Sequence, residues 1–306
     1  MSDQRSPVPQ PWIQTVFLGP RGIRSPWRVL LALAFYKIFA YTIGAALIAN
    51  GIVYRWLEAE RLASLSPGLL LFGESIRTLA GLLAGICMAK IEGRSFSEYG
   101  LKWNKVSAKQ FLFGIPLGLA MLALLMSTMY ALRAVSFSVD SLNASEVLKH
   151  GVLYGAGYLL VGLFEEGAFR GYLQATLATD FGFWPTAFVL SITFGAVHLG
   201  NRGESIFGIL MASCFGLLAA FSVRRTGNIW LAIGMHASWD WGQSFLYGTP
   251  NSGIVARGHL LLSWFHGSQW LTGGSVGPEG SVLVFPVLLF WVLTIHSIFP
   301  AKARNA

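Results

Sequence analysis

The chain has 306 residues, of which 54% are hydrophobic and only 12% are charged, and its formal net charge is +8. Because a soluble domain of average composition has about 25% charged residues, this composition excludes an ordinary soluble protein and predicts one embedded in a lipid bilayer. The basic residues are dispersed between apolar runs rather than gathered on one face, which argues against a nucleic-acid-binding protein.

Eight apolar stretches follow an N-terminal region that is rich in proline and lacks the continuous apolar core of a secretory signal. A helix needs about 20 apolar residues to cross a bilayer. In chain order, we predict helices over residues 29–53, 68–89, 110–132, 151–178, 184–200, 205–223, 228–247 and 281–300. The sequence therefore predicts an all-α fold, a polytopic bundle of about eight transmembrane helices.

The distribution of lysine and arginine predicts the orientation of this bundle. If both termini lie in the cytoplasm, the cytoplasmic segments hold 13 basic residues and the outer segments hold 6. Since cytoplasmic loops are enriched in Lys and Arg, we expect both termini on that side. The long loop 248–280, which contains Trp264, Phe265 and Trp270, is either a re-entrant or interfacial lid or an exposed loop with aromatic anchors.

Ionisable side chains inside the predicted spans are candidate functional residues, because each costs at least about 2.5–3.5 kcal/mol near the bilayer centre. Glu74 and Arg77 have a simpler interpretation as an ion pair within one helix. Lys37 can extend to the interface, and His296 lies near the end of the last span. The remaining residues fall on only three of the eight spans: Glu165, Glu166, Arg170, His198, His236 and Asp240.

The spacing of the acidic residues on the fourth span predicts their partners. Glu166 and Arg170 are four residues apart and can pair along one helix face. Glu165 and Glu166 point about 100° apart, so we expect them to face different partners. This arrangement would leave Glu165 free to face another helix.

The two histidines also have neighbours at helical spacing. Phe194 precedes His198 by four residues, so its ring can form a wall beside the imidazole. Asp240 follows His236 by four residues, so its carboxyl group can orient or charge that ring.

This set of residues points to hydrolysis within the membrane. A glutamate partly removed from water is suited to accept a proton from a water molecule near neutral pH, and a His–Asp pair can donate hydrogen bonds to a developing oxyanion. No Ser or Cys stands in a recognised nucleophile motif, which leaves activated water as the natural nucleophile. We therefore expect hydrolysis of an amide bond.

Zinc is left open by the sequence. Glu165, His198 and His236 could together ligate Zn²⁺ with one open position. However, the H-E-x-x-H pattern is absent, and these three residues lie on separate helices. The spacing neither requires nor excludes a metal, and our expectation is that no cofactor is required.

The three motifs Glu165-Glu166-x-x-x-Arg170, Phe194-x-x-x-His198 and His236-x-x-x-Asp240 resemble those of the CPBP family. This is the group of type II CAAX prenyl endopeptidases and bacteriocin-processing proteins, also called the ABI family. The resemblance covers residues 150–247. A weaker similarity to bacterial members lies in Leu271-Thr272-Gly273-Gly274 and Gly277-Pro278-Glu279-Gly280.

The resemblance implies an eight-helix membrane bundle with a cavity among the motif helices. By position, Glu165 and His198 would activate water, His236 and residue 240 would stabilise the oxyanion, and Arg170 would fix the glutamates. The third motif often ends in Asn. Here it ends in Asp240, which accepts but does not donate hydrogen bonds when ionised. Asp240 is therefore either protonated in its apolar setting or serves to orient His236 instead.

The resemblance divides the chain into a cytoplasmic tail (1–28), N-terminal transmembrane helices (29–147), a catalytic core (148–247) and the aromatic loop with the last helix (248–306). It implies a bacterial inner-membrane endopeptidase whose partners are the lipid bilayer and a membrane-associated protein or peptide, prenylated or not. Two alternatives stay open, a non-catalytic immunity or scaffold protein of the same family and a proton-coupled transporter. The intact motifs count against the former, and the lack of a visible internal repeat counts against the latter.

Overall fold

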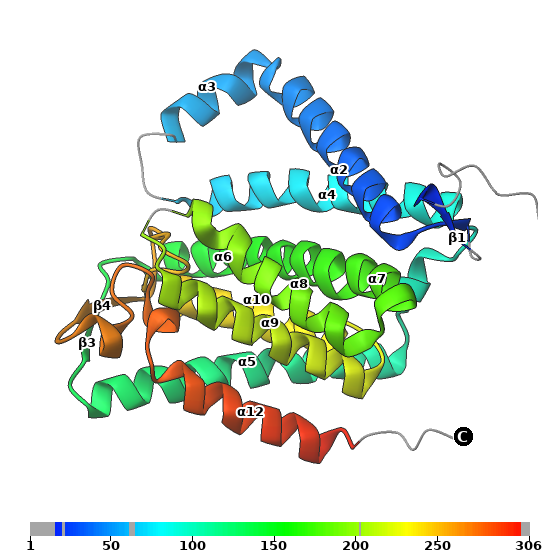
Figure 1. Cartoon of the computed structure of the whole chain (residues 1–306). Helices are drawn as coiled ribbons and strands as arrows, with labels where there is room; N and C mark the ends of the chain where they lie inside the picture. Colours follow the sequence, from blue (N-terminus) through cyan, green and yellow to red (C-terminus); the bar gives the residue numbers. More distant parts are fainter. Residues whose placement is uncertain (1–15, 20–21, 61–64, 202, 301–306) are drawn as a thin grey trace, which may run out of the picture.

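The computed structural model describes residues 16–19, 22–60, 65–201 and 203–300. A helix covers each of the eight predicted spans, and most of these helices lie side by side in one bundle (Figure 1). They are α2 (Ser25–Ile48), α4 (Pro67–Ile91), α5 (Lys105–Ala131), α6 (Ala144–Glu166) continued by η2 (Gly167–Leu173) and α7 (Gln174–Phe181), α8 (Phe183–Val197), α9 (Ile206–Thr226), α10 (Trp230–Trp241) continued by η4 (Gly242–Leu246), and α12 (Val284–Ile298). The predicted all-α membrane bundle is confirmed.

Within the described residues, six helical segments are long and apolar enough to cross a membrane: α2, α4, α5, the continuous segment Ala144–Phe181, Phe183–Gly200 and α9. The apolar helix α12 is shorter, with 15 residues, and α10 has 12. All ten residues from Leu231 to Asp240 of α10 are buried, so this helix is enclosed by the others. The chain is an integral membrane protein.

Local sequence explains where several helices begin. Ser66, Asn104, Asn143 and Ser205 each accept a hydrogen bond from a backbone N–H in the first turn of α4, α5, α6 and α9. The predicted first span, 29–53, was wrong at its end because α2 stops at Ile48. The side chain of Asn50 then accepts hydrogen bonds from the first N–H groups of a separate helix, α3 (Gly51–Glu60).

Small residues let α5 approach α10 closely. A Cβ atom at Gly114 or Gly118 would overlap the backbone of α10 at Leu231 or Met235, and one at Gly234 would overlap the backbone of α5. Such contacts between backbones are typical of helix packing in membranes. They place α10, with His236 and Asp240, at a fixed depth within the bundle.

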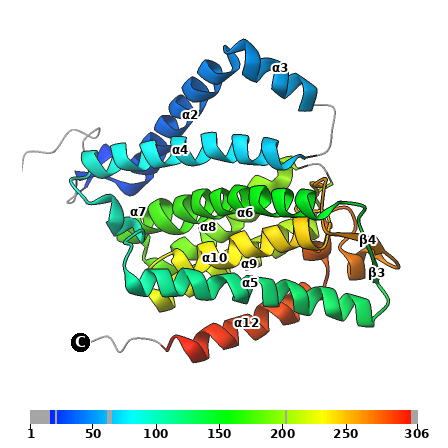
Figure 2. The same cartoon turned by 180° about the vertical axis from the view of Figure 1, so that it is seen from behind.

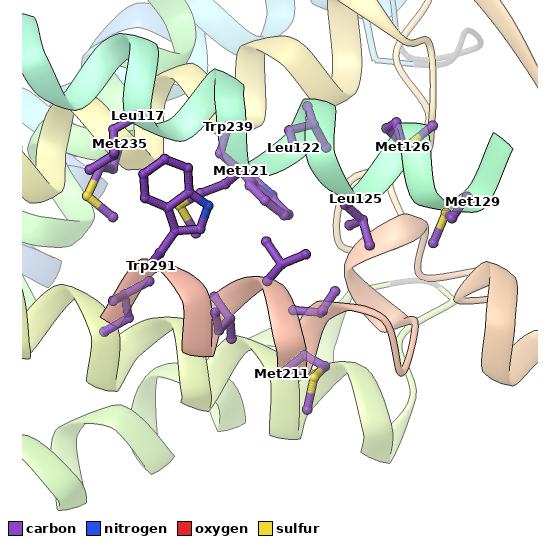
Figure 3. Close-up of a cluster of buried hydrophobic side chains, with 14 of the residues drawn as sticks. Leu117, Met121, Leu122, Leu125, Met126, Met129, Met211, Met235, Trp239 and Trp291 are labelled. Carbon is purple, nitrogen blue, oxygen red and sulfur yellow. The ribbon is translucent and has the colours of Figure 1, made fainter. Parts of the chain in front are cut away.

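Large apolar side chains fill the space between α5, α9, α10 and α12. Met121, Leu122 and Leu125 of α5 are fully buried, and Trp239 and Trp291 lie near them from α10 and α12 (Figure 3). The short helix α12 is thus held by packing against α5 and α9.

Two short strand pairs are present that the sequence analysis does not predict. β1 (Leu18–Gly19) pairs with β2 (Gly22–Ile23), and β3 (Val135–Val139) pairs antiparallel with β4 (Leu261–Phe265). β4 belongs to the predicted loop 248–280, which also contains α11 (Gln269–Thr272) and η5 (Pro278–Gly280). This loop is therefore folded onto one end of the bundle (Figure 2).

The two views agree that the first and last described residues lie at the same end of the bundle, opposite β3 and β4 (Figures 1 and 2). Arg28 of α2 pairs with Glu92 at that end, with 3.3 Å between Nη1 and Oε2. Arg225 at the end of α9 contacts His296 of α12 there.

Replacing Gly118 by alanine tests the packing of α5 on α10. The added Cβ would overlap the Met235 carbonyl group, so we expect a loss of about 1–3 kcal/mol in stability. The measurement is the thermal midpoint of the purified protein in detergent. Gly73→Ala is the matched control, because a Cβ at Gly73 meets nothing within 4 Å. Equal midpoints for the two variants would contradict this description of the interface.

Candidate functional site

A cavity of about 260 Å³ lies among α4, α6, α8, α9, α10 and the loop before α12. Four of the predicted site residues line it, namely Glu165, His198, His236 and Asp240. Glu166 and Arg170 lie behind this wall, where their exposed fractions are 0% and 4%. The six predicted residues are therefore in one neighbourhood but in two layers.

Glu166 is the buried anchor of the site. Its Oε1 lies 3.3 Å from Nη1 of Arg170 and 2.8 Å from Nδ1 of His236. The i,i+4 pair with Arg170 forms as the spacing predicts. Opposite the guanidinium of Arg170, the carboxylate of Glu166 accepts and Nδ1–H of His236 donates.

The guanidinium of Arg170 needs space from two other helices. A Cβ at Gly216 of α9 would lie 2.6 Å from Nη2 of Arg170, so a larger residue there would displace the guanidinium. The ring of Phe194 from α8 lies over the guanidinium at 4.3 Å to its centroid. Arg170 sits in the π-helical turn η2, a distortion that often occurs at functional sites.

Glu165 faces the cavity. Its Oε1 lies 3.5 Å from Nη2 of Arg77, and its Oε2 lies 3.8 Å from Nε2 of His236. The expectation that the adjacent glutamates face different partners was wrong, because both contact His236. The reason is that an imidazole has one nitrogen on each edge, and the two carboxyl groups meet opposite edges.

His198 occupies another wall of the cavity and has a defined tautomer. Its Nδ1 lies 2.7 Å from the carbonyl oxygen of Phe194, which can only accept, so Nδ1 carries the proton. Nε2 is then the acceptor nitrogen of the neutral ring. The Phe194 ring stands edge-on to His198 at 5.0 Å between centroids, in the predicted i,i+4 arrangement.

Asp240 lies beside His236, with 3.5 Å between Oδ2 and Nε2. The Nε2 atom of His236 thus faces two carboxyl groups, those of Glu165 and Asp240. This contact fits the interpretation that Asp240 orients or charges the ring, as the helical spacing predicts.

Sequence reasoning assigned Glu74 and Arg77 to a structural ion pair and left them out of the site. They do pair, with 2.7 Å between Nη1 and Oε1, but both also line the cavity. Arg77 connects Glu74 to Glu165. An Arg three residues from an acidic residue inside a span is the sequence signal that could have identified them. The guanidinium of such a pair can still bind a third group on another helix.

Glu279 is a further carboxyl group on the cavity wall, contributed by the loop that follows η4. Its Oε1 accepts hydrogen bonds from the backbone N–H of Ser252 and from the Ser252 hydroxyl, the latter at 2.8 Å. Burial, and next the charge of Asp240, raise the pKa of Glu279 to about 7. The sequence singled out Gly277-Pro278-Glu279-Gly280 only as a similarity and assigned it no role.

A zinc site needs several His, Cys, Asp or Glu ligands arranged around one point. Among the described residues, no group of three or more such side chains is arranged to hold a metal ion. The Nδ1 atoms of His198 and His236 are engaged in hydrogen bonds, which leaves the Nε2 atom of each ring as the possible ligand. The described residues therefore do not form a recognisable zinc site.

The segment from residue 149 to residue 242 matches the family model described as "Type II CAAX prenyl endopeptidase Rce1-like". The chain carries an Rce1-like domain. This match confirms the family resemblance seen in the three motifs, and it includes Glu165 and Asp240 but not Glu74, Arg77 or Glu279. No curated protein and no solved structure gave a match.

Replacing Arg170 by methionine tests the buried anchor. Glu166 would lose its guanidinium partner and keep only the contact with His236, so we expect a loss of about 3–5 kcal/mol in stability, measured as a lower thermal midpoint. Arg55→Met is the control, because Arg55 is exposed on α3 and forms no ion pair with another described residue. A midpoint for Arg170→Met as high as that of the control would contradict the anchor role.

The raised pKa of Glu279 predicts a pH dependence of stability. The folded protein favours the protonated carboxyl group, so this group destabilises the folded state as pH rises from about 4.5 to about 7. The glutamine of Glu279→Gln does not ionise. The free energy of unfolding of this variant should therefore exceed that of the wild type by on the order of 1–3 kcal/mol at roughly pH 8 and equal it at acidic pH.

The control for this measurement is Glu98, whose effect on stability should change with pH in the opposite direction. A hydrogen bond from the Ser95 backbone and the nearby Arg94 lower the pKa of Glu98, so its contribution is lost as pH falls. Glu98→Gln should therefore lower stability at neutral pH and not at acidic pH. Denaturation curves of wild type and Glu279→Gln that run parallel across this pH range would contradict the assignment.

Proposed function

We propose that this protein is an intramembrane endopeptidase that hydrolyses a peptide bond of a membrane-associated protein, using water activated by Glu165. The match of residues 149–242 to the Rce1-like family model supports this proposal. The observation that carries the proposal is the position of Glu165, whose carboxyl group faces the cavity between Arg77 and His236.

The first step requires a proton acceptor at the water molecule. Glu165 takes a proton as the water oxygen bonds to the carbonyl carbon of the substrate. Nε2 of neutral His198, on the same cavity, accepts a hydrogen bond from that water and orients its lone pair. The hydrogen bond at Nδ1 of His198 and the position of Glu165 on the cavity wall support these two roles.

The second step requires a donor at the carbonyl oxygen, which becomes an oxyanion. His236 holds its Nδ1–H towards Glu166, so its Nε2 is the ring atom available on the cavity side. Three surrounding carboxyl groups favour a charged ring, whose Nε2–H donates to the oxyanion. The C–N bond then breaks, and the proton held by Glu165 passes to the leaving amine.

The orientation of the chain is part of the proposal. The first and last described residues lie at one end of the bundle, as an even number of crossings requires. Arg28, Lys90, Arg94 and Arg225 belong to the helix ends on that side. The positive-inside rule then assigns this end to the cytoplasm and the β3–β4 end to the opposite side. A bacterial inner membrane is the setting that the family resemblance implies.

The decisive variant is Glu165→Gln, assayed with a fluorogenic reporter peptide in proteoliposomes. Loss of the proton acceptor should lower kcat by roughly 10²–10⁴-fold, while the thermal midpoint stays near that of the wild type because the amide keeps the size of the carboxyl group. Glu98→Gln, a surface carboxyl outside the cavity, is the matched control. Cleavage by Glu165→Gln at the rate of the control would overturn the proposal.

The same preparation separates water activation by glutamate from metal chemistry. We expect the wild type to keep its rate after dialysis against a chelator and to purify without stoichiometric zinc. Loss of activity that is restored by Zn²⁺ would contradict the metal-free mechanism while leaving peptide hydrolysis intact. Comparison of protein termini between cells with wild type and cells with Glu165→Gln then identifies the natural substrate.

A further inference from the structure

The carboxyl group of Glu279 is held in place by hydrogen bonds to one of its two oxygen atoms. Ser252 supplies both hydrogen bonds, and both go to Oε1. The other oxygen, Oε2, belongs to a side chain on the cavity wall. The segment that carries Ser252 is itself fixed, because Gly253 N–H donates to Val276 and Gln243 donates to Pro250. Glu279 is therefore a rigidly mounted acceptor that faces the cavity.

Charged groups line the cavity together. Arg77 lies between Glu74 and Glu165, and His236 lies between Glu165 and Asp240. Glu279 and Asp240 line the same cavity, where burial and next the charge of Asp240 raise the pKa of Glu279. Among the described lining residues, four carboxyl groups, those of Glu74, Glu165, Asp240 and Glu279, thus share the cavity with the guanidinium of Arg77.

Cations among the described residues do not balance these carboxyl groups. Arg77 is already shared by Glu74 and Glu165, and His236 is shared by Glu165, Glu166 and Asp240. Glu74 still has a buried Oε2 without a hydrogen-bond partner among the described residues. Since charges in a low-dielectric site are stable only when paired, a cation from outside would balance Asp240 and Glu279.

The rest of the cavity favours an apolar segment around that cation. Its walls include Leu70, Val161, Met211, Ile254 and Leu288. A substrate segment that enters from the membrane brings apolar side chains for these walls. Lysine and arginine are suited to such a place because their aliphatic stems pack on apolar surface while the charged end reaches a carboxylate.

We propose that Glu279 and Asp240 form a specificity subsite for a lysine or arginine side chain of the substrate segment. The proposal rests on the proposed function and names the class of substrate for that site. Glu279 acts here by binding the substrate, away from the bond that is cleaved. A free carboxylate on the substrate would be repelled from this side of the cavity.

The test measures binding without turnover, in Glu165→Gln protein reconstituted in nanodiscs. The probes are fluorescent, N-acetylated apolar peptides in which a single lysine is moved along the sequence, each with a matched peptide that has norleucine at that position. At one lysine position, we expect at least about 10-fold tighter binding than with norleucine, an advantage of about 1.4 kcal/mol. Raising the salt concentration should reduce the advantage.

Two further variants in the same background assign the effect. Adding Glu279→Gln should reduce the lysine advantage to less than about threefold, and adding Glu279→Lys should make a glutamate peptide bind more tightly than the lysine peptide. Adding Glu98→Gln should leave the advantage intact. A peptide with a free N-terminus and norleucine reveals whether an α-amine can replace the side chain.

Outcomes separate this subsite from the proposed hydrolysis. Lysine and norleucine peptides that bind equally, or that both fail to bind, overturn the subsite. A lysine advantage that survives Glu279→Gln in protein with a normal thermal midpoint overturns it as well. Preferential binding of lysine with no cleavage by the wild type supports the subsite and contradicts the hydrolysis, whereas cleavage without preference does the reverse.

Discussion

The imidazole of His236 is held at both edges by carboxyl groups, two from the neighbouring helix α6 and one from its own helix α10. Glu166, with its partner Arg170, takes Nδ1 at 2.8 Å, while Glu165 and Asp240 face Nε2. In a bundle surrounded by lipid, none of these charges is stable alone. Each requires the others, and the position of α6 relative to α10 is fixed by that requirement. The remainder of the site is arranged around this ring.

The scaffold of the bundle serves the same constraint. Glycines at positions 114, 118 and 234 bring the backbones of α5 and α10 together, and Gly216 leaves space for Arg170 between α8 and α9. A well-packed interior shifts little when one side chain changes. The chemically active groups can therefore face a cavity while the charges that orient them stay buried behind it. Such a two-layer arrangement is what catalytic sites need, since reacting groups must be held by neighbours that do not themselves move.

Much of this could be predicted from the sequence, and the exceptions have physical causes. Apolar runs fixed the eight helices, and i,i+4 spacing predicted the pairs of Glu166 with Arg170 and His236 with Asp240, because both depend only on local geometry. The contact of both glutamates with one imidazole, the reach of Arg77 to Glu165, and the arrival of Glu279 at the cavity are long-range. They depend on how helices and a folded loop pack, and no periodicity in the sequence records that packing. The strand pair β3–β4 was missed for the same reason, since its two strands lie more than a hundred residues apart.

The protonation state of His236 tests the central role of this ring most directly. The protein can be labelled with ¹⁵N-histidine, and the signal of His236 assigned by its loss in His236→Gln. We expect Nδ1 to resonate as a protonated, hydrogen-bonded nitrogen throughout the pH range in which the protein stays folded, and Glu166→Gln to shift this signal. An unprotonated Nδ1 in the wild type, unaffected by Glu166→Gln, would contradict the anchoring of His236 by Glu166.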